Sequence, residues 1–197
     1  GPTRLLVEEQ VPPLRVVRAF PGDDGMAVVH LHNISGGVLG GDQLHLAAAL
    51  EAGAQAQLTT TGSTRLYRQR EGYGPAVQSN RFSVGPGALL EYLPDSLIPY
   101  ADSRFRQTTR IDLAADAGLF YWEVLAPGRT ARGEAFAYAA LEMELEIYGA
   151  GEPLVLERLR WQPDRHDLRS PARLGEYGYF GVLYACRVGV AEERWLA

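Results

Sequence analysis

The chain has 197 residues, of which 46% are hydrophobic and 22% are charged, so it suits one folded domain and is not a disordered segment. Its formal net charge of −5 argues against a general affinity for nucleic acid, which needs a basic face. All 19 strongly basic residues are arginine, and the absence of lysine excludes a P-loop, a Schiff base and a lysine general base. The single cysteine excludes an internal disulfide and a multi-cysteine zinc site.

The apolar runs of the chain are far shorter than the roughly 20 residues that a membrane-spanning helix needs. No charged segment followed by an apolar one precedes the first predicted strand, so no targeting leader is predicted. We therefore expect a cytoplasmic protein that binds neither nucleic acid nor membranes.

Alternating apolar residues predict strands along most of the chain, and no long helical period is visible. Residues 4–20 are predicted to form a strand pair, and residues 26–32 form the next strand. Residues 43–60 are predicted to form a hairpin that turns at Gly53, because apolar residues keep one parity on each side of that glycine.

Glycine and alanine recur as a dipeptide before apolar runs, at Gly53-Ala54, Gly87-Ala88 and Ala117-Gly118. The spacing of roughly thirty residues is within the range of stacked repeat units, although chance dipeptides in a glycine-rich chain would give the same pattern. We expect a mainly β fold, either β-helix-like or built of stacked antiparallel strands, with few short helices.

The clearest strand pattern covers residues 134–149, where apolar and acidic residues alternate. A further strand is predicted over residues 154–161, and residues 190–197 are expected to form a short helix. In the second of these strands Glu157 shares its parity with large apolar residues, where an unpaired carboxylate costs desolvation energy. Three interpretations stay open: an ion pair with an arginine, a general acid, and a group that lines a water-filled internal passage.

Two further features concern metal or anion binding. His30 and His32 are two residues apart on a predicted strand, so both face the same way and could bind Ni²⁺ or Zn²⁺, although exposed strand histidines are common. The glycine pairs of GGVLGG, at residues 36–41, do not fit a phosphate-binding loop, because no helix follows them. Asp42 follows this segment directly and is either a turn-closing acid or a functional one.

Acidic residues recur through the middle of the chain, at Glu91, Asp95, Asp102, Glu123 and Glu134. Paired carboxylates would suit a β-helical carbohydrate-active enzyme, which is the alternative to a non-catalytic protein. No sequence motif places two of these acids in one cleft, and neither a nucleophile elbow nor a zinc-protease motif is present.

Five sequence blocks, in this order and spacing, resemble the urease accessory protein D (UreD) family. They are GGVLGGDQL at 36–44, LTTTGSTRLYR at 58–68, LEYLPDSLIPYADSRF at 90–105, WEVLAPGRTARGEAF at 122–136 and EPLVLERLR at 152–160. The threonine block departs modestly from the family pattern. The resemblance implies one UreD-like domain over residues 1–197, lacking the C-terminal extension that members usually carry.

The resemblance also implies a mostly β, β-helix-like chaperone without catalytic activity or a tightly bound cofactor. Such a protein would bind apo-urease together with accessory proteins F and G, and a dimer within that assembly is compatible with the family. It would help to deliver nickel(II) through an internal passage, in which nickel is bound only transiently. Asp42 and Glu157 fall at acidic positions that would suit this passage, and His30 and His32 are weaker candidates.

Overall fold

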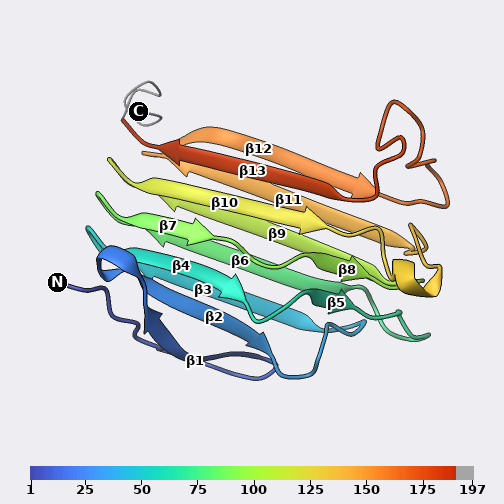
Figure 1. Cartoon of the computed structure of the whole chain (residues 1–197), viewed down its shortest axis with the longest axis horizontal. Helices are drawn as coiled ribbons and strands as arrows, with labels where there is room; N and C mark the ends of the chain where they lie inside the picture. The colour runs from blue at the N-terminus through green and yellow to red at the C-terminus, as the bar shows by residue number, and fades with distance from the viewer. Residues whose placement is uncertain (190–197) are drawn as a thin grey trace.

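The computed structural model describes residues 1–189, which form two β-sheets packed face to face (Figure 1). The only helical elements in this part of the chain are two short 3-10 turns, η1 (Asp23–Gly25) and η2 (Thr130–Arg132). None of the described helices is long or apolar enough to cross a bilayer. The prediction of a mainly β fold is confirmed.

The first sheet holds eight of the strands. These are β1 (Leu14–Pro21), β2 (Ala27–Asn33), β4 (Gln55–Thr60), β5 (Thr64–Leu66), β7 (Leu89–Tyr92), β8 (Leu97–Pro99), β10 (Gly118–Leu125) and β13 (Phe180–Arg187). Strands β4 and β5 lie in line, as do β7 and β8 (Figure 1). Strand β10 therefore pairs with β7 and β8 on one side and with β13 on the other.

The second sheet holds the remaining five strands. In spatial order they are β12 (Glu152–Trp161), β11 (Ala140–Gly149), β9 (Arg104–Leu113), β6 (Ala76–Val84) and β3 (Gln43–Leu50). The chain passes back and forth between the two sheets, so most neighbouring strands within a sheet run parallel. Antiparallel pairs occur only at the ends of the described sheets, in β1–β2, β10–β13 and β11–β12.

The recurring dipeptides mark a structural repeat. They precede β4, β7 and β10, which are adjacent parallel strands of the first sheet, and Leu89 pairs with Gln55 on one side and Gly118 on the other. The turns before these strands also stack, because the Gly53 amide donates to the Pro86 carbonyl at 2.9 Å. The three dipeptides therefore stand at equivalent places in the fold, and between one dipeptide and the next the chain forms two in-line strands of the first sheet and one strand of the second.

Three strand predictions are wrong or too long. The hairpin over residues 43–60 is wrong, because β3 and β4 lie in different sheets and the turn at Gly53 crosses between them. The strand pair over residues 4–20 reduces to β1 alone, and the strand predicted from residue 134 begins at Ala140. The helix expected at 190–197 lies outside the described residues. The predicted strands at 26–32 and 154–161 are confirmed as β2 and β12.

The apolar core between the sheets is divided into two clusters. One contains Phe82, Leu90, Ile111, Leu119 and Ile147, which are all fully buried. The other is centred on Val38, Leu66, Phe105 and Leu141. A continuous sandwich core would form one cluster. The two apolar clusters are therefore separated by side chains of another kind.

Candidate functional site

Polar side chains from the second sheet point into the core where the two apolar clusters meet. The strand register aligns them in two neighbouring rungs that run across the sheet. One rung joins Leu46, Asn80, Thr109, Leu145 and Glu157, and the next joins Leu44, Gln78, Gln107, Met143 and Leu159. We refer to six side chains as the polar band: Glu123 from the facing sheet, and Gln78, Asn80, Gln107, Thr109 and Glu157 from the second sheet.

Hydrogen bonds link the members of the polar band. The Gln78 amide donates to Asn80 Oδ1 at 3.0 Å, and Asn80 Nδ2 donates to Thr109 Oγ1 at 3.1 Å. The Gln107 amide donates to Glu123 across the gap between the sheets. Asn80, Gln107 and Thr109 are each at most 2% exposed. Burying these groups is costly without partners, and the network offsets that cost.

Glu123 is brought into the core by the alternation of β10. Leu119, Tyr121 and Leu125 share its parity, and all three are buried. Desolvation, with a smaller contribution from the nearby Glu157 carboxylate, raises the pKa of the Glu123 carboxyl to about 7, against the opposing effects of the Tyr121 hydroxyl and the Gln107 amide. This carboxyl therefore changes charge near neutral pH, unlike an ordinary glutamate.

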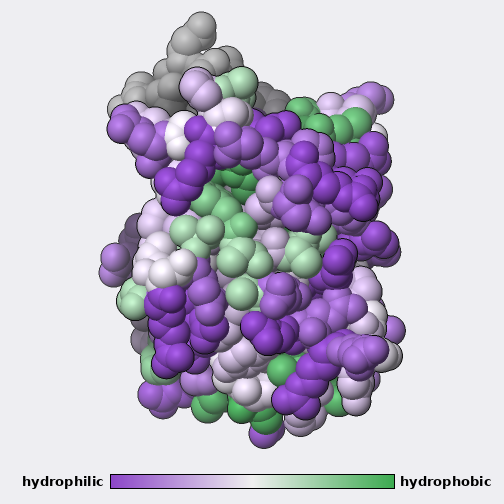
Figure 2. Space-filling model, turned by 90° about the vertical axis from the view of Figure 1, so that its right-hand side faces the viewer, coloured by the Kyte–Doolittle hydropathy of each residue, from purple (hydrophilic) through white to green (hydrophobic). Residues whose placement is uncertain are grey.

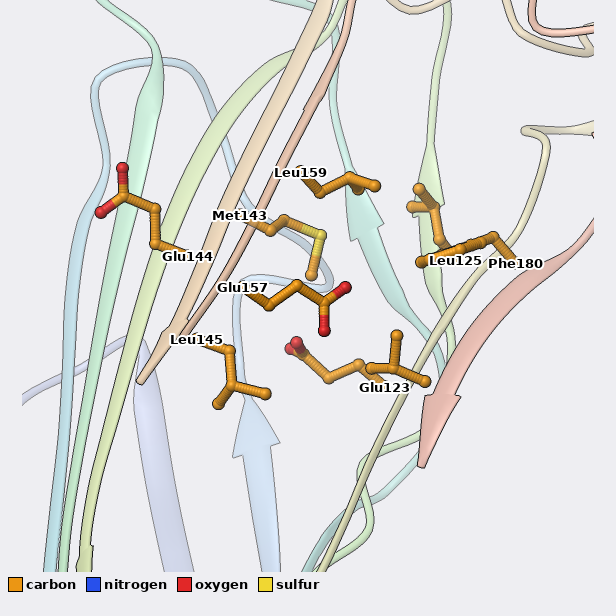
Figure 3. Close-up of a pocket in the computed structure, with 9 residues that line it drawn as sticks. Glu123, Leu125, Met143, Glu144, Leu145, Glu157, Leu159 and Phe180 are labelled. Atoms are coloured by element: carbon orange, nitrogen blue, oxygen red, sulfur yellow. The ribbon is translucent and has the colours of Figure 1, made fainter. Parts of the chain in front are cut away.

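Glu157 on β12 faces Glu123 across a small pocket between the sheets. Figure 3 shows the two carboxylates pointing toward each other, with Leu145 and Met143 beside them. The Tyr184 hydroxyl donates a hydrogen bond to Glu157, and no ion pair of Glu157 is found within residues 1–189. The pocket volume of about 30 Å³ gives room for one or two water molecules.

A larger cavity of about 200 Å³ lies on the other side of Glu123. The glycine-rich segment and the threonine block form one part of its wall, with Gly37, Val38 and Thr60 among the lining residues. Gln107 and Glu123 line it as well, and Glu123 also lines the small pocket. The polar band therefore reaches from one hollow to the other through the middle of the sandwich.

Tyrosines of the first sheet cover the polar band from the opposite side. Tyr92 and Tyr121 are buried and stack with ring centroids 5.6 Å apart, and Tyr121 lies 6.4 Å from Tyr184. Burial raises the pKa of the hydroxyls of Tyr92 and Tyr121. These hydroxyls stay neutral at physiological pH, so they add hydrogen-bonding oxygens to the core without adding charge.

The structure separates Asp42 from Glu157. Asp42 accepts a hydrogen bond from the Leu39 amide at 2.9 Å and so closes the turn before β3. Strands β3 and β12 are the two outer strands of the second sheet, so four strand spacings alone put Asp42 and Glu157 more than roughly 19 Å apart. The acid that accompanies Glu157 is Glu123, and its parity with Leu119 and Leu125 was the sequence signal for it.

His30 and His32 lie on the outer face of the first sheet, away from the polar band. They alternate with the buried Val29 and Leu31, and the His30 ring packs against Phe20 with centroids 5.5 Å apart. Within residues 1–189 no group of three or more histidine, cysteine or acidic side chains is placed to hold a metal ion. Binding of nickel by this pair stays a prediction.

Most of the other recurring acids have structural partners. Glu91 lies on the outer face of the first sheet and accepts a hydrogen bond from Gln57, so it cannot share a cleft with Glu123. Glu134 binds Arg129 and the Ala101 amide, which orders the loop after β10. The Arg129 guanidinium also lies above the Tyr100 ring, so Tyr100 packs against the Arg129–Glu134 ion pair.

Comparison with known proteins identifies the family. A family model described as UreD urease accessory protein matches residues 1–195. The chain belongs to the UreD urease accessory protein family. This confirms the resemblance seen in the sequence blocks, and it places the chain among accessory proteins of urease and not among enzymes.

Relatives named urease accessory protein UreD match nearly the whole chain. The protein from Herpetosiphon aurantiacus is 51% identical over 195 residues, which cover 99% of this chain and 68% of the relative. The relative from Deinococcus radiodurans is 41% identical over 91% of this chain and 64% of its own length. The chain thus spans about two thirds of the length of these UreD proteins.

Proposed function

We propose that this chain is a urease maturation scaffold that binds apo-urease together with accessory proteins F and G and passes nickel(II) along the polar band. The observation that carries the proposal is the row of buried polar groups that crosses an otherwise apolar core between two hollows. A sandwich that needed only stability would fill this position with apolar side chains. Membership of the UreD family supports the maturation role.

The chemistry of the polar band suits a metal ion in transit. Carboxylate, amide and hydroxyl oxygens bind Ni²⁺ weakly compared with thiolate and imidazole ligands, so they let the ion move on. Two carboxylates, Glu123 and Glu157, face each other at the small pocket, where they lower the cost of bringing a dication into the core.

Glu123 also provides a means of release. Near neutral pH its carboxyl is partly protonated, so an arriving cation displaces a proton and a departing cation is replaced by one. The dication neutralises both carboxylate charges while it is bound, and the proton that replaces it neutralises one of them. Nickel is retained only briefly, as a passage requires.

The proposal is tested by separating partner binding from nickel delivery. Glu123→Gln and Glu157→Gln, alone and together, keep the shape of the band and remove its charge. We expect all three variants to pull down apo-urease and accessory protein F like the wild type, while urease activation falls about tenfold. Glu91→Gln is the matched control, because Glu91 lies on the outer face of the same sheet as Glu123.

Two outcomes would contradict this proposal. A folded wild-type chain that binds neither apo-urease nor accessory protein F would overturn the scaffold role. Normal urease activation by the Glu123→Gln/Glu157→Gln double variant would overturn the passage but leave the scaffold role intact.

The alternative function, a carbohydrate-active enzyme, is favoured less by the geometry. Glu91 and Glu123 lie on opposite faces of the first sheet. Glu123 and Glu157 do face each other, but their pocket of about 30 Å³ holds one or two waters and no sugar ring. Hydrolysis of a glycan that is lost in Glu123→Gln would revive this alternative.

A further inference from the structure

A separate pocket lies at the end of the sandwich, between the end of β12 and the loop formed by residues 162–179. Its apolar part includes Trp161, Leu174 and Phe180, and its basic part consists of Arg160, His166 and Arg173. We refer to it as the loop pocket. Leu159 and Phe180 also line the small pocket beside Glu157, but the loop pocket contains no member of the polar band. Its volume of about 330 Å³ is at the lower end of the range for ligand pockets.

The apolar part of the loop pocket is a defined surface. The rings of Trp161 and Phe180 meet edge to face with centroids 5.0 Å apart. The loop is held over them by its own hydrogen bonds, since the Leu174 amide donates to the Leu168 carbonyl at 3.0 Å and Leu168 is buried. The pocket is therefore shaped before any ligand arrives, and it would accept a large apolar side chain.

The basic part of the loop pocket contains an arginine that is not paired with a carboxylate in the described residues. Arg173 is exposed and donates to the carbonyl oxygen of Asp167, which is a neutral partner. Arg160 lies 3.3 Å from Glu142, a carboxylate that it shares with Arg106. The lining includes no carboxylate, although the whole chain carries a net charge of −5. Three acids and three arginines balance within the loop, so the preference for an anionic ligand rests on the pocket lining, where Arg173 faces no lining carboxylate.

The surroundings of the loop pocket resemble a protein interface. Tyr177 and Tyr179, from the same loop, are 70% and 61% exposed. Exposed tyrosine together with arginine and tryptophan is the composition of interface hot spots. Figure 2 views the right-hand end of the sandwich of Figure 1, the end that carries this loop, and the surface there mixes hydrophobic and hydrophilic residues.

We propose that the loop pocket binds an acidic, hydrophobic peptide segment of a partner protein. One large apolar side chain of the segment packs on Trp161 and Phe180, and carboxylates next to it pair with Arg173 and His166. The inference does not rest on nickel transfer, because no residue of the loop pocket belongs to the polar band. It supplies a docking point on a scaffold whose role is to hold other proteins.

The test is selection of random peptides displayed on phage against the immobilised full chain. We expect the selected peptides to combine Asp or Glu with a neighbouring Leu, Phe or Trp. The best peptide, made synthetically with a fluorescent label, should bind Arg173→Glu about tenfold more weakly than the wild type. His166→Ala should weaken binding less. Arg160 is left unchanged in these variants because it pairs with Glu142.

Arg81→Glu is the matched control, since Arg81 is an exposed arginine on β6, three strands away from β12. Binding of the peptide to this variant should equal that to the wild type, and circular dichroism should show that all variants are folded. The proposal is overturned if no acidic peptides are enriched, or if they bind Arg173→Glu as tightly as the wild type. Displacement of the peptide by adenosine monophosphate at lower concentration than by free peptide would identify a phosphate site instead.

Discussion

Two glutamates illustrate what can be read from single residues. Glu157 stands on the apolar parity of its strand, and this alone predicted an unusual environment, which the structure confirms. The same test applied to β10 selects Glu123, between Tyr121 and Leu125. Asp42 passes no such test, because it stands in a turn, and its hydrogen bond to the Leu39 amide fits the structural interpretation. The pairing of Glu123 with Glu157 needs the sheet packing, which the sequence does not contain.

The raised pKa of Glu123 predicts a pH-dependent stability. In the folded protein this carboxyl titrates at about 7 and in the unfolded chain near 4.3, so the folded state binds the extra proton between these values. Stability from this group is therefore lost as the pH rises from about 4.3 to about 7. With Glu157, Tyr121 and Gln107 near this carboxyl and room for water in the pocket beside it, the loss should be about 1–3 kcal/mol.

Glu123→Gln should remove this dependence. We expect the variant to exceed the wild type in unfolding free energy by about 1–3 kcal/mol at pH 8, with little difference at pH 5. Urea denaturation at both pH values measures it, and Glu91→Gln is the control. Equal pH profiles for Glu123→Gln and the wild type would show that the Glu123 carboxyl titrates normally.

At the scale of elements, the sequence predicted strands better than their partners. Alternation identified β2, β3, β4 and β12, because each has one face in the core. It could not distinguish a hairpin from a turn between facing sheets, since both give apolar residues of one parity on each side of Gly53. The roughly thirty-residue repeat contained the missing information, because parallel neighbours must be separated by a complete passage through the other sheet.

The glycine-rich segment at residues 36–41 is required for close packing between elements. A side chain at Gly37 would place its Cβ 2.7 Å from the Arg65 carbonyl oxygen. The neighbouring Val38 makes two backbone hydrogen bonds at β5, each 2.8 Å long. Its amide donates to the Arg65 carbonyl, and its carbonyl accepts from the Tyr67 amide just after the strand. Any residue larger than glycine must therefore push the segment away from β5.

Gly37→Ala should accordingly destabilise the protein by about 1–3 kcal/mol. Gly74→Ala is the matched control, because an added Cβ there meets nothing within 4 Å and the backbone is not left-handed. Thermal and urea denaturation of both variants checks the expectation. If both substitutions have the same small effect, the close approach of this segment to β5 is not a constraint on the fold.

For the whole molecule, the sequence blocks predicted the family, and the comparisons confirm it. An internal passage was expected from that resemblance, but one of its proposed walls was placed on Asp42, at the far side of the sheet. The row of Asn80, Thr109 and Gln107 was not predicted, because polar residues on a strand face are ordinary where that face meets water. Only the packing of the second sheet shows that this face is buried.

The polar band is therefore a feature that the fold does not need. Its central members, Asn80 and Thr109, are bonded to each other, so replacing both with apolar groups of similar shape removes donor and acceptor together. The Gln78 amide loses its Asn80 acceptor, but Gln78 lines the larger cavity, where water can take the place of that acceptor. The stability of an Asn80→Leu/Thr109→Val double variant should stay within about 2 kcal/mol of the wild type. The charges of Glu123 and Glu157 are unchanged in this variant.

Transfer of radioactive nickel to apo-urease by this double variant is the most direct measurement of whether the band is the passage. Binding of apo-urease and accessory protein F is measured in parallel, and Gln57→Leu on the outer face of the first sheet is the control. We predict normal binding and a fall in nickel transfer of about tenfold or more. Transfer at the wild-type rate by a stable, partner-binding Asn80→Leu/Thr109→Val variant would contradict the passage.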